Sequence, residues 1–262
     1  MTATQKTVPA AAPGAGNALL SSPARWIGGR VAVCFSARDA ANAREVWEAG
    51  EGSAIVSLEA AKYPDEAAFS AAVSSMMSAV PVLSVALGGG ADPKQWAKVL
   101  AGGLAGAQHL NQPFSTAAFV KGRVAAGPNS WVNGVVRPSG TVGAVLLEMV
   151  DGHAIPVSAT DAARFLREAG VDALKFHPAR GVEILPEVVA ACTAASTVGL
   201  TGFEPAGGIG PDNIIELTRA CVATGIPYFL PHVFGSVVDK ATGRTKPEAV
   251  AAIVRDLRAA LE

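Results

Sequence analysis

Charged residues are scarce in this sequence. They make up 16% of the 262 residues, and 21 basic side chains against 22 acidic ones leave a net charge of −1 at pH 7. The chain has no block of basic residues, on which binding to nucleic acid or to an anionic membrane depends. We therefore expect neither partner, and a small molecule is the better prediction for the ligand.

Cysteine is also rare and widely spaced. The three cysteines, Cys34, Cys192 and Cys221, cannot all pair with one another, which is typical of reduced thiols in a cytosolic protein. Half of the residues are hydrophobic, so a chain of this length buries a sufficient core without disulfides or metal ions.

Long apolar runs are missing as well. The longest stretches, such as VPVLSVALGGGA, are too short to span a bilayer. The first residues, MTATQKTVPAAAPGAG, hold one lysine and no continuous apolar segment, which is unlike a secretory signal. We expect a disordered N-terminal arm over residues 1–25, one domain over residues 26–262, and a soluble cytoplasmic protein without a membrane partner.

What the sequence does contain is an alternation of short β-rich runs and longer helical patterns, which indicates a parallel α/β fold. The runs predict strands at 30–35, 53–58, 82–87, 107–112, 172–176, 201–204 and 227–231. The helical patterns between and after them cover 37–50, 64–79, a segment opening at Asp92-Pro93, 158–169, 182–198, 211–224 and 246–260.

One segment, residues 129–156, breaks this rhythm with turn-like dipeptides and must hold the fifth strand or an insertion around it. Eight strand–helix units in about 230 residues favour a single-domain (β/α)8 TIM barrel. An open doubly wound sheet is the alternative, and it usually has fewer strands.

A lysine lies within one of the apolar strands, in DALKFHP. Strand side chains alternate between the two faces, so Leu174 and Phe176 should face the helices while Ala173, Lys175 and His177 face the barrel interior. An amine buried there has a lowered pKa and can attack a ketone to form a Schiff base. The alternative is a structural lysine that pairs with a buried carboxylate or binds a phosphate without covalent chemistry.

Two glycine-containing segments follow late strands. GFEPAGGIGPDN offers bare backbone N–H groups ahead of a helix expected to begin near Pro211, and YFLPHVFGS ends a strand with His232 before Gly235 and Ser236. Loops after strands seven and eight form the recurrent phosphate site of TIM barrels. Each loop alone is more often an ordinary tight turn, but the two together favour phosphate binding.

The chain resembles the KDGP aldolases, the 2-dehydro-3-deoxy-6-phosphogluconate aldolases associated with glucosaminate breakdown. The resemblance covers roughly residues 30–256 and is carried by WVNG, PSGT, LKFHP, GFEPAGGI and PHVFGSVVDKATG, with weaker support from GGGADPKQW and HLNQPF. It implies a phosphate-binding TIM barrel related to lysine-dependent class I aldolases. It also implies that Lys175 forms the Schiff base and that the phosphate contacts are Gly207, Gly208, Gly235 and Ser236.

Aldol chemistry also needs an acid and a base. Glu204, at the end of the seventh strand, is the first candidate, because burial beside a lysine tunes a carboxylate toward neutrality. His177 and His232 follow, although His177 is equally a space-filling residue and His232 more often a residue that shapes its loop.

Other polar residues are candidates for substrate contacts. His109 and Asn111 alternate onto one side of a strand and would reach the substrate carboxylate or hydroxyl groups, although His109 is equally a core residue. Arg180 and Arg137 suit a phosphate or a carboxylate, and each is as readily a solvated surface charge. No metal-ligand spacing such as H-x-H or H-E-x-x-H is present, so no metal or other cofactor is expected.

These patterns lead to one hypothesis and two rivals. The leading one is a class I aldolase that binds a phosphorylated keto acid and cleaves a 2-keto-3-deoxy sugar acid phosphate to pyruvate and glyceraldehyde 3-phosphate. The rivals are a phosphosugar isomerase or synthase on the same barrel without an imine, and a non-catalytic barrel that binds phosphorylated metabolites. An alanine-rich surface with few charges also predicts a homo-oligomer.

Overall fold

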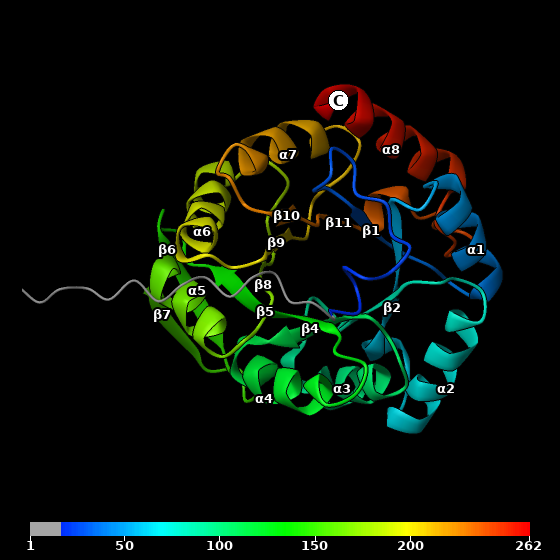
Figure 1. Ribbon diagram of the computed structural model, residues 1–262, viewed down its shortest axis with the longest axis horizontal. Helices are drawn as coiled ribbons and strands as arrows, with labels where there is room; N and C mark the ends of the chain where they lie inside the picture. The colour runs from blue at the N-terminus through cyan, green and yellow to red at the C-terminus, as the bar shows by residue number, and fades with distance from the viewer. Residues whose placement is uncertain (1–16) are drawn as a thin grey trace, which may run out of the picture.

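A computed structural model describes residues 17–262 and shows a curled sheet of parallel strands surrounded by helices (Figure 1). Neighbouring strands pair in the order β10-β9-β8-β5-β4-β3-β2-β1-β11. The strands are β1 (Val33–Ser36), β2 (Ala54–Glu59), β3 (Leu83–Ala86), β4 (His109–Pro113), β5 (Trp131–Pro138), β8 (Ala173–Phe176), β9 (Gly202–Pro205), β10 (Tyr228–Phe229) and β11 (His232–Val233).

The helices alternate with most of these strands along the chain, as the sequence predicts, although the helix over 114–125 was not among those expected. They are α1 (Ala40–Ala49), α2 (Glu66–Met77), α3 (Trp96–Leu104), α4 (Phe114–Ala125), α5 (Ala159–Glu168), α6 (Leu185–Val198), α7 (Ile214–Val222) and α8 (Pro247–Leu261). Short 3-10 turns occupy η1 (Ala60–Lys62), η2 (Pro93–Gln95) and η3 (Gly235–Val237). None of the helices in residues 17–262 is long and apolar enough to cross a bilayer.

Polar side chains fix where several helices begin. Asp39, Asp65 and Ser158 each accept a hydrogen bond from the backbone N–H three residues later, which satisfies an otherwise unpaired donor of the first turn. The helix expected to begin near Pro211 begins later in the structure. Residues 211–213 form a turn, and α7 starts at Ile214.

Residues 129–156, which interrupt the predicted alternation of strands and helices, contain both the fifth strand and an insertion. β5 is the fifth strand of the parallel sheet, and an antiparallel hairpin of β6 (Ala144–Glu148) and β7 (Ala154–Ser158) follows it. β6 pairs with the end of β5, so the hairpin extends from the sheet and lies beside α5 and α6 (Figure 1).

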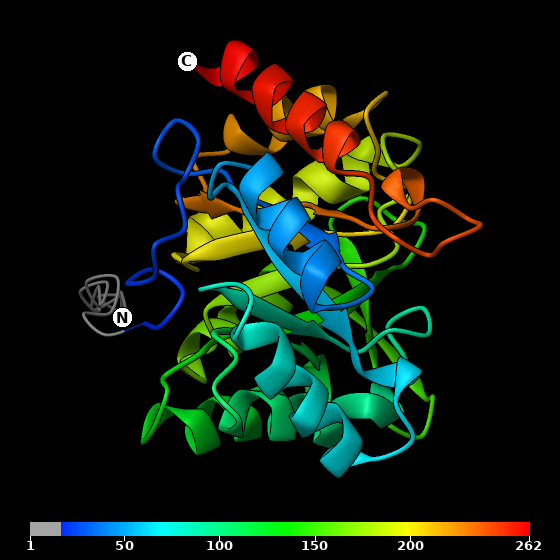
Figure 2. The same ribbon diagram turned by 90° about the vertical axis from the view of Figure 1, so that its right-hand side faces the viewer.

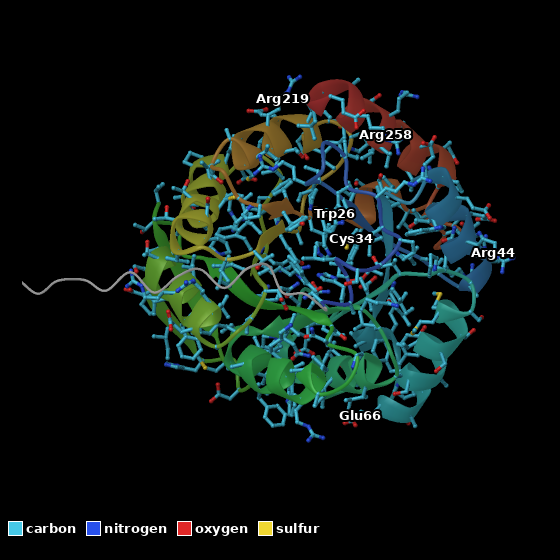
Figure 3. The ribbon with its side chains drawn as sticks, viewed as in Figure 1. Trp26, Cys34, Arg44, Glu66, Arg219 and Arg258 are labelled. Atoms are coloured by element: carbon cyan, nitrogen blue, oxygen red, sulfur yellow. The ribbon has the colours of Figure 1, made fainter. Side chains whose placement is uncertain are left out.

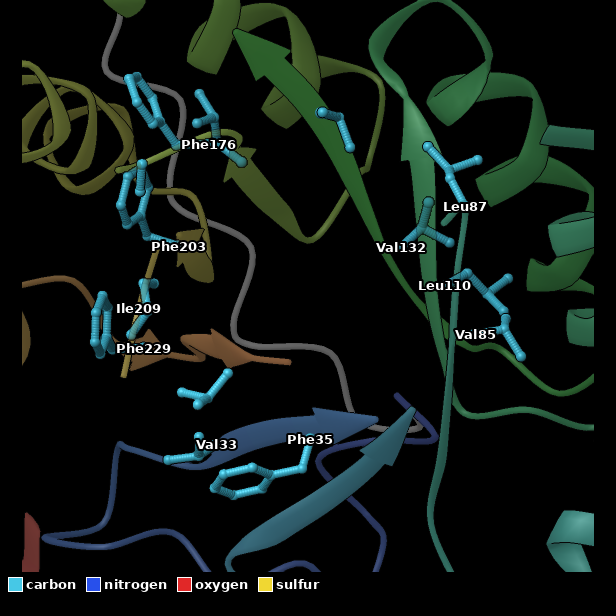
Figure 4. Close-up of a cluster of buried hydrophobic side chains, with 14 of the residues drawn as sticks. Val33, Phe35, Val85, Leu87, Leu110, Val132, Phe176, Phe203, Ile209 and Phe229 are labelled. Atoms are coloured by element: carbon cyan, nitrogen blue, oxygen red, sulfur yellow. The ribbon is translucent and has the colours of Figure 1, made fainter. Parts of the chain in front are cut away.

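Two apolar layers hold this arrangement together. One lies between sheet and helices and includes Leu174 and Phe176, and Figure 4 shows Phe176 in line with Phe203 and Phe229 of the next strands. The other lies on the concave side of the sheet and includes Ala173 and seven further residues: Leu19, Ala32, Cys34, Ile55, Val82, Trp131 and Leu230. The alternation predicted for β8 is therefore confirmed for these residues.

The labelled apolar side chains lie near the centre of the molecule in Figure 3, and most of the labelled charged ones lie at its periphery. In Figure 3, Trp26 and Cys34 lie at the centre of the view, whereas Arg44, Glu66 and Arg219 lie at its rim. All three cysteines are buried and free, as the sequence predicts.

The N-terminal segment corrects one boundary. Residues 1–16 of the expected disordered arm lie outside the described residues, but 17–25 pack against one end of the sheet, opposite the loop that follows β11 (Figure 2). Leu19 is completely buried, and the Asn17 amide donates to Asp172 at 3.0 Å. Residues 17–25 therefore belong to the folded domain, because Leu19 closes the apolar layer on the concave side.

Replacing Leu19 by Ala tests this packing. We expect a loss of about 2–5 kcal/mol in the free energy of unfolding, because a fully buried leucine leaves a cavity. Urea unfolding of Leu19→Ala against Ile155→Ala, whose isoleucine is 41% exposed, measures the difference. Equal losses in the two variants would show that the segment adds nothing to the core.

Candidate active site

A cavity of about 600 Å³ opens at the carboxyl ends of the parallel strands. Ligand sites of parallel α/β folds lie at this end, where loops vary without disturbing the sheet. Eight of the ten predicted site residues line it: Asn111, Lys175, His177, Gly207, Gly208, His232, Gly235 and Ser236. The remaining two, Glu204 and Arg180, do not line it.

The Lys175 amine lies on the concave face of β8 and is 4% exposed. Its Nζ donates to Oδ1 of Asn111 at 2.6 Å and contacts Nδ1 of His232 at 3.0 Å. No ion pair to a carboxylate is formed by this amine within residues 17–262. Burial is the main cause that lowers the pKa of Lys175 to about 8, which the charge of Glu204 partly opposes.

Two acceptors suit a neutral amine. An unprotonated lysine has two N–H groups and one lone pair, and Asn111 and His232 take both hydrogens. The lone pair then remains, and Lys175 lines the cavity. The surroundings therefore suit an unprotonated amine better than an ion-paired ammonium group.

Glu204 lies beneath the cavity, fully buried, and pairs in register with Lys175 across β8 and β9. Its carboxylate accepts four N–H groups, from Nε1 of Trp131 at 2.7 Å, Nδ2 of Asn133 at 2.6 Å, Nε2 of His109 at 3.0 Å and Nε2 of His232 at 3.0 Å. A carboxylate has about four lone-pair positions, so this group is saturated.

This saturation corrects the expectation that Glu204 is tuned toward neutrality. Burial acts to raise the pKa of Glu204, but the interactions with His109 and His232 outweigh it and hold the pKa well below its usual value. The ionised carboxylate instead orients the groups around it, including the histidine that contacts Lys175.

The hydrogen-bond partners assign the tautomers of both inner histidines. His232 Nδ1 faces the Lys175 amine and His109 Nδ1 faces the Ser84 hydroxyl at 2.7 Å, so each Nδ1 accepts and each Nε2–H donates to Glu204. Burial, followed by the charge of Lys175, lowers the pKa of His232 to about 3. His232 is therefore a neutral acceptor for the lysine N–H.

The same three side chains, His109, Glu204 and His232, form the group in the described chain with ligand atoms close enough for a metal ion, all within 4.8 Å. Sequence spacing does not reveal this group, because its members come from three different strands. Their ligand atoms are engaged with one another, and Trp131 and Asn133 also donate to the carboxylate. The donor set therefore fits a hydrogen-bond network better than an ion.

The two loops for which the sequence predicts phosphate binding lie beside this network. The backbone N–H groups of Gly207, Gly208 and Gly235 have no acceptor among residues 17–262, and φ is +93° at Gly207 and +73° at Gly208. The Gly210 N–H is already bound to the Asn213 side chain at 3.0 Å. The unpaired N–H groups of this region are therefore those of the glycines rather than those of the helix N-terminus expected at Pro211.

Arg180 does not join these loops. Its side chain is 55% exposed and lies 3.8 Å from Glu183, while its backbone packs under Gly208. A Cβ added at Gly208 would lie 2.9 Å from the Arg180 Cα, so glycine at 208 lets the two segments approach closely.

Sequence reasoning missed Glu59, which lines the cavity at the end of β2 and is 19% exposed. Ile55 and Ser57 face the concave side of β2, and Glu59 continues this alternation toward the opening. Its Oε1 is 2.7 Å from Nζ of Lys62. The predicted strand ended at residue 58, and one more residue in the same alternation would have identified this carboxylate.

Replacing Glu204 by Gln tests the buried network. The variant places an NH2 group among N–H donors, so we expect a loss of about 3–5 kcal/mol in the free energy of unfolding near neutral pH. Because the folded-state pKa is lowered, the stabilisation by this group is complete above about pH 4.5 and is lost as the pH falls toward the folded-state pKa. Urea unfolding from pH 7 downward measures both effects.

Glu59→Gln is the matched control at the rim of the same cavity, where we expect a change within about 1 kcal/mol. Equal stability of the Glu204 and Glu59 variants would contradict the saturated network.

Comparisons with known proteins bear on this site. The model of the family described as KDGP aldolase matches residues 27–241. A protein named 2-dehydro-3-deoxy-phosphogluconate aldolase, from Salmonella typhimurium, is 35% identical over 237 residues, which cover 88% of this chain and 96% of that protein.

Two solved structures resemble this chain in fold alone, because their sequence identities to it are low. A 3-hexulose-6-phosphate synthase superposes with a TM-score of 0.56 at 16% identity, and KGPDC from Streptococcus mutans with a TM-score of 0.59 at 10% identity. Each comparison covers 89% of this chain and all of the other. The curled parallel sheet is thus of the TIM-barrel-like kind. Since the family model and the relative both span most of the sequence, the resemblance in the motifs is confirmed and this chain belongs to the KDGP aldolase family.

Proposed function

We propose that this protein is a class I aldolase that cleaves a 2-keto-3-deoxy sugar acid phosphate, such as 2-dehydro-3-deoxy-6-phosphogluconate, to pyruvate and glyceraldehyde 3-phosphate. One observation carries the proposal: a buried amine with two hydrogen-bond acceptors and no carboxylate partner, at the wall of a cavity of about 600 Å³. Membership of the KDGP aldolase family and the name of the Salmonella relative support it.

The first step is attack of the Lys175 lone pair on the keto carbon. A proton moves from the nitrogen to the oxygen to give a carbinolamine, which takes one more proton from solvent, loses water and becomes a positively charged iminium at carbon 2. Asn111 and His232 orient the amine for this attack, and the ionised Glu204 beneath them offsets the new positive charge.

Carbon–carbon cleavage follows from the iminium. The hydroxyl group on carbon 4 loses its proton, its oxygen forms the aldehyde carbonyl, and the electrons of the C3–C4 bond move into the iminium to give an enamine. The enamine then takes a proton at carbon 3, and water releases pyruvate and restores the Lys175 amine. One carboxylate is sufficient to carry the proton from the hydroxyl group to carbon 3.

Glu59 is the residue we assign to this proton transfer. It lines the cavity from β2, which three strands separate from β8 in the sheet order, so it faces the substrate from another side than Lys175. Asp212 also lines the cavity, but it is exposed and belongs to the turn after the glycine loop. Glu204 is buried outside the cavity lining and acts through His232.

Phosphate binding and closure of the sheet complete the proposal. The free N–H groups of Gly207, Gly208 and Gly235 suit the substrate phosphate, with Ser236 beside them at the cavity wall.

β10 and β11 serve as two parts of one eighth strand that closes a (β/α)8 barrel, because Phe229 bridges to Val31 and His232 bridges to Ala206. No cofactor is needed for this chemistry.

Self-association belongs to the proposal as well. Three large apolar side chains are more than half exposed on consecutive helices, namely Leu104 of α3, Phe119 of α4 and Phe165 of α5. Burying them against a second copy removes apolar surface from water, and sedimentation measures the outcome.

Trapping tests the Schiff base. Incubation with pyruvate and borohydride should add a reduced pyruvate group to Lys175, located by mass spectrometry of peptides. The rate of trapping should rise with pH and level off above about pH 8, because the amine is unprotonated above its pKa. Lys175→Arg keeps the charge but not the nucleophile and should trap nothing.

Lys94→Met, at an exposed position on η2, is the control and should trap as the unchanged protein does. A protein that cleaves the substrate without any trapped adduct would contradict the imine.

Replacing Glu59 by Gln tests the proton transfer. The turnover number for cleavage should fall by about 10²–10⁴-fold, the usual contribution of a general acid or base. Trapping of pyruvate at Lys175 should persist, because imine formation uses a different group. Glu66→Gln, on the exposed first turn of α2, should leave turnover unchanged. Unchanged cleavage by Glu59→Gln would remove this residue from the mechanism.

A further inference from the structure

Arg137, at the end of β5, joins four segments around the cavity. Its guanidinium pairs with Glu148 of β6 at 2.6 Å and donates to the backbone oxygens of Gly90 at 2.8 Å and Ala91 at 3.1 Å. Its Nη1 also lies 2.7 Å from Nδ1 of His177. The side chain is 18% exposed, so these contacts account for most of its surface.

The Arg137 contact fixes the tautomer of His177. A guanidinium group only donates hydrogen bonds, so Nδ1 of His177 must accept and the ring proton must lie on Nε2. Nε2 has no partner among the residues that the structure describes, and His177 lines the cavity. The site therefore presents an N–H donor to whatever the cavity holds.

The charges around His177 keep the ring neutral. Lys175 faces it from the same strand and Arg137 from β5, while Glu148 of β6 is paired with Arg137. The wall segments 88–91 and 206–210 contain no ionisable side chain. Burial, followed by the charges of Lys175 and Arg137, lowers the pKa of His177 to about 3. A neutral imidazole can then donate a hydrogen bond without giving up its proton over the working pH range.

The position of the ring indicates which part of a ligand it meets. His177 follows Lys175 by two residues on the same face of the chain, and its Cδ2 lies 3.5 Å from the place of a Cβ on Gly207. The ring thus lies beside the glycine loop, in the wall of the cavity that Lys175 also lines. A ligand joined to Lys175 at carbon 2 and held by its phosphate at that loop passes carbons 3 to 5 along the ring.

We propose that His177 is a catalytic hydrogen-bond donor to the oxygen on carbon 4 of the keto acid, and that Arg137 is the positioning residue that aims it. This inference rests on the aldolase function proposed above and adds the group that handles the aldehyde oxygen. It replaces the role of base or acid that the sequence suggests for His177. The substrates it selects are keto acids with a free hydroxyl group on carbon 4, and in the reverse direction aldehydes.

The step balances with His177 keeping its proton throughout. The hydroxyl proton of carbon 4 passes to Glu59, the C3–C4 electron pair passes to the iminium on Lys175, and the aldehyde oxygen remains bound to Nε2–H. As negative charge develops on that oxygen, the hydrogen bond strengthens, so the donor stabilises the transition state more than the substrate. A charged imidazolium would instead repel the nearby iminium.

Arg137 has a second effect through the cavity wall. Residues Gly88, Gly89, Gly90 and Ala91 all have positive φ, and +65° at Ala91 is a strained value for a residue with a Cβ. The two hydrogen bonds from Arg137 hold this segment in place. Loss of the guanidinium should therefore raise KM as well as lower kcat, whereas a change at His177 alone should act mainly on kcat.

Paired variants at His177 test the donor. His177→Phe keeps a ring without a donor and should lower kcat for cleavage on the order of 10²-fold with little change in KM, the usual effect of removing one such donor. His177→Gln supplies a side-chain N–H and should recover part of that loss. His153→Phe, at an exposed turn, is the control and should match the unchanged protein.

Variants at Arg137 test the positioning role. In Arg137→Met the ring loses its fixed tautomer and the adjacent charge, so the profile of kcat against pH should gain an acid limb above about pH 3. This limb should stay below the ordinary histidine pKa of about 6.5, because burial and the charge of Lys175 still lower the pKa of His177. The unchanged protein should show no such limb, and Arg137→Lys should show a weaker one because the charge remains. Arg164→Met, whose arginine is 60% exposed on α5, should show none.

Pyruvate trapping separates this inference from the function on which it rests. If no protein in the series traps pyruvate at Lys175, the aldolase function itself fails. If all trap pyruvate, but His177→Phe retains kcat within about twofold or Arg137→Met gains no acid limb, the donor pair is refuted while the aldolase stands. Trapping by each variant also shows that its site has folded.

Discussion

The ionised carboxylate of Glu204 is the constraint on which the site depends. It is buried beneath the cavity, where an unpaired charge would cost several kcal/mol, and it is retained because four N–H groups converge on it. Those donors come from strands distant in sequence, so the carboxylate fixes their relative positions. Through His232 it also fixes the acceptor that orients the Lys175 amine.

This arrangement solves an electrostatic problem at the lysine. A carboxylate in direct contact with Lys175 would keep the amine protonated, whereas no negative charge at all would leave the proposed iminium without compensation. Placing neutral His232 between Glu204 and the amine satisfies both needs, because the charge acts at a distance and the hydrogen bonds go to neutral acceptors. The pKa of Lys175, about 8, lies between these extremes.

How far the sequence predicts this molecule depends on the range of the interactions. The period-2 alternation of a strand is local, so the inward position of Lys175 and the cavity at the strand ends were predictable. The partners of Glu204 were not, because His109 meets it 95 residues away through the curvature of the sheet. Glu59 was not predicted, because the expected strand ended one residue too early. The burial of Leu19 was not predicted either, because it depends on strands that come later in the chain.

The hairpin that interrupts the strand–helix rhythm contributes to the same site. β6 supplies Glu148, which pairs with Arg137, and Arg137 in turn holds both the 88–91 wall and the ring of His177. Without that acid, the guanidinium beside His177 would add an uncompensated positive charge near the iminium proposed for Lys175. The insertion therefore makes it possible to keep an arginine near the cavity that Lys175 lines. In the proposed mechanism, Arg137 acts on the substrate through the neutral ring of His177 rather than through its own charge.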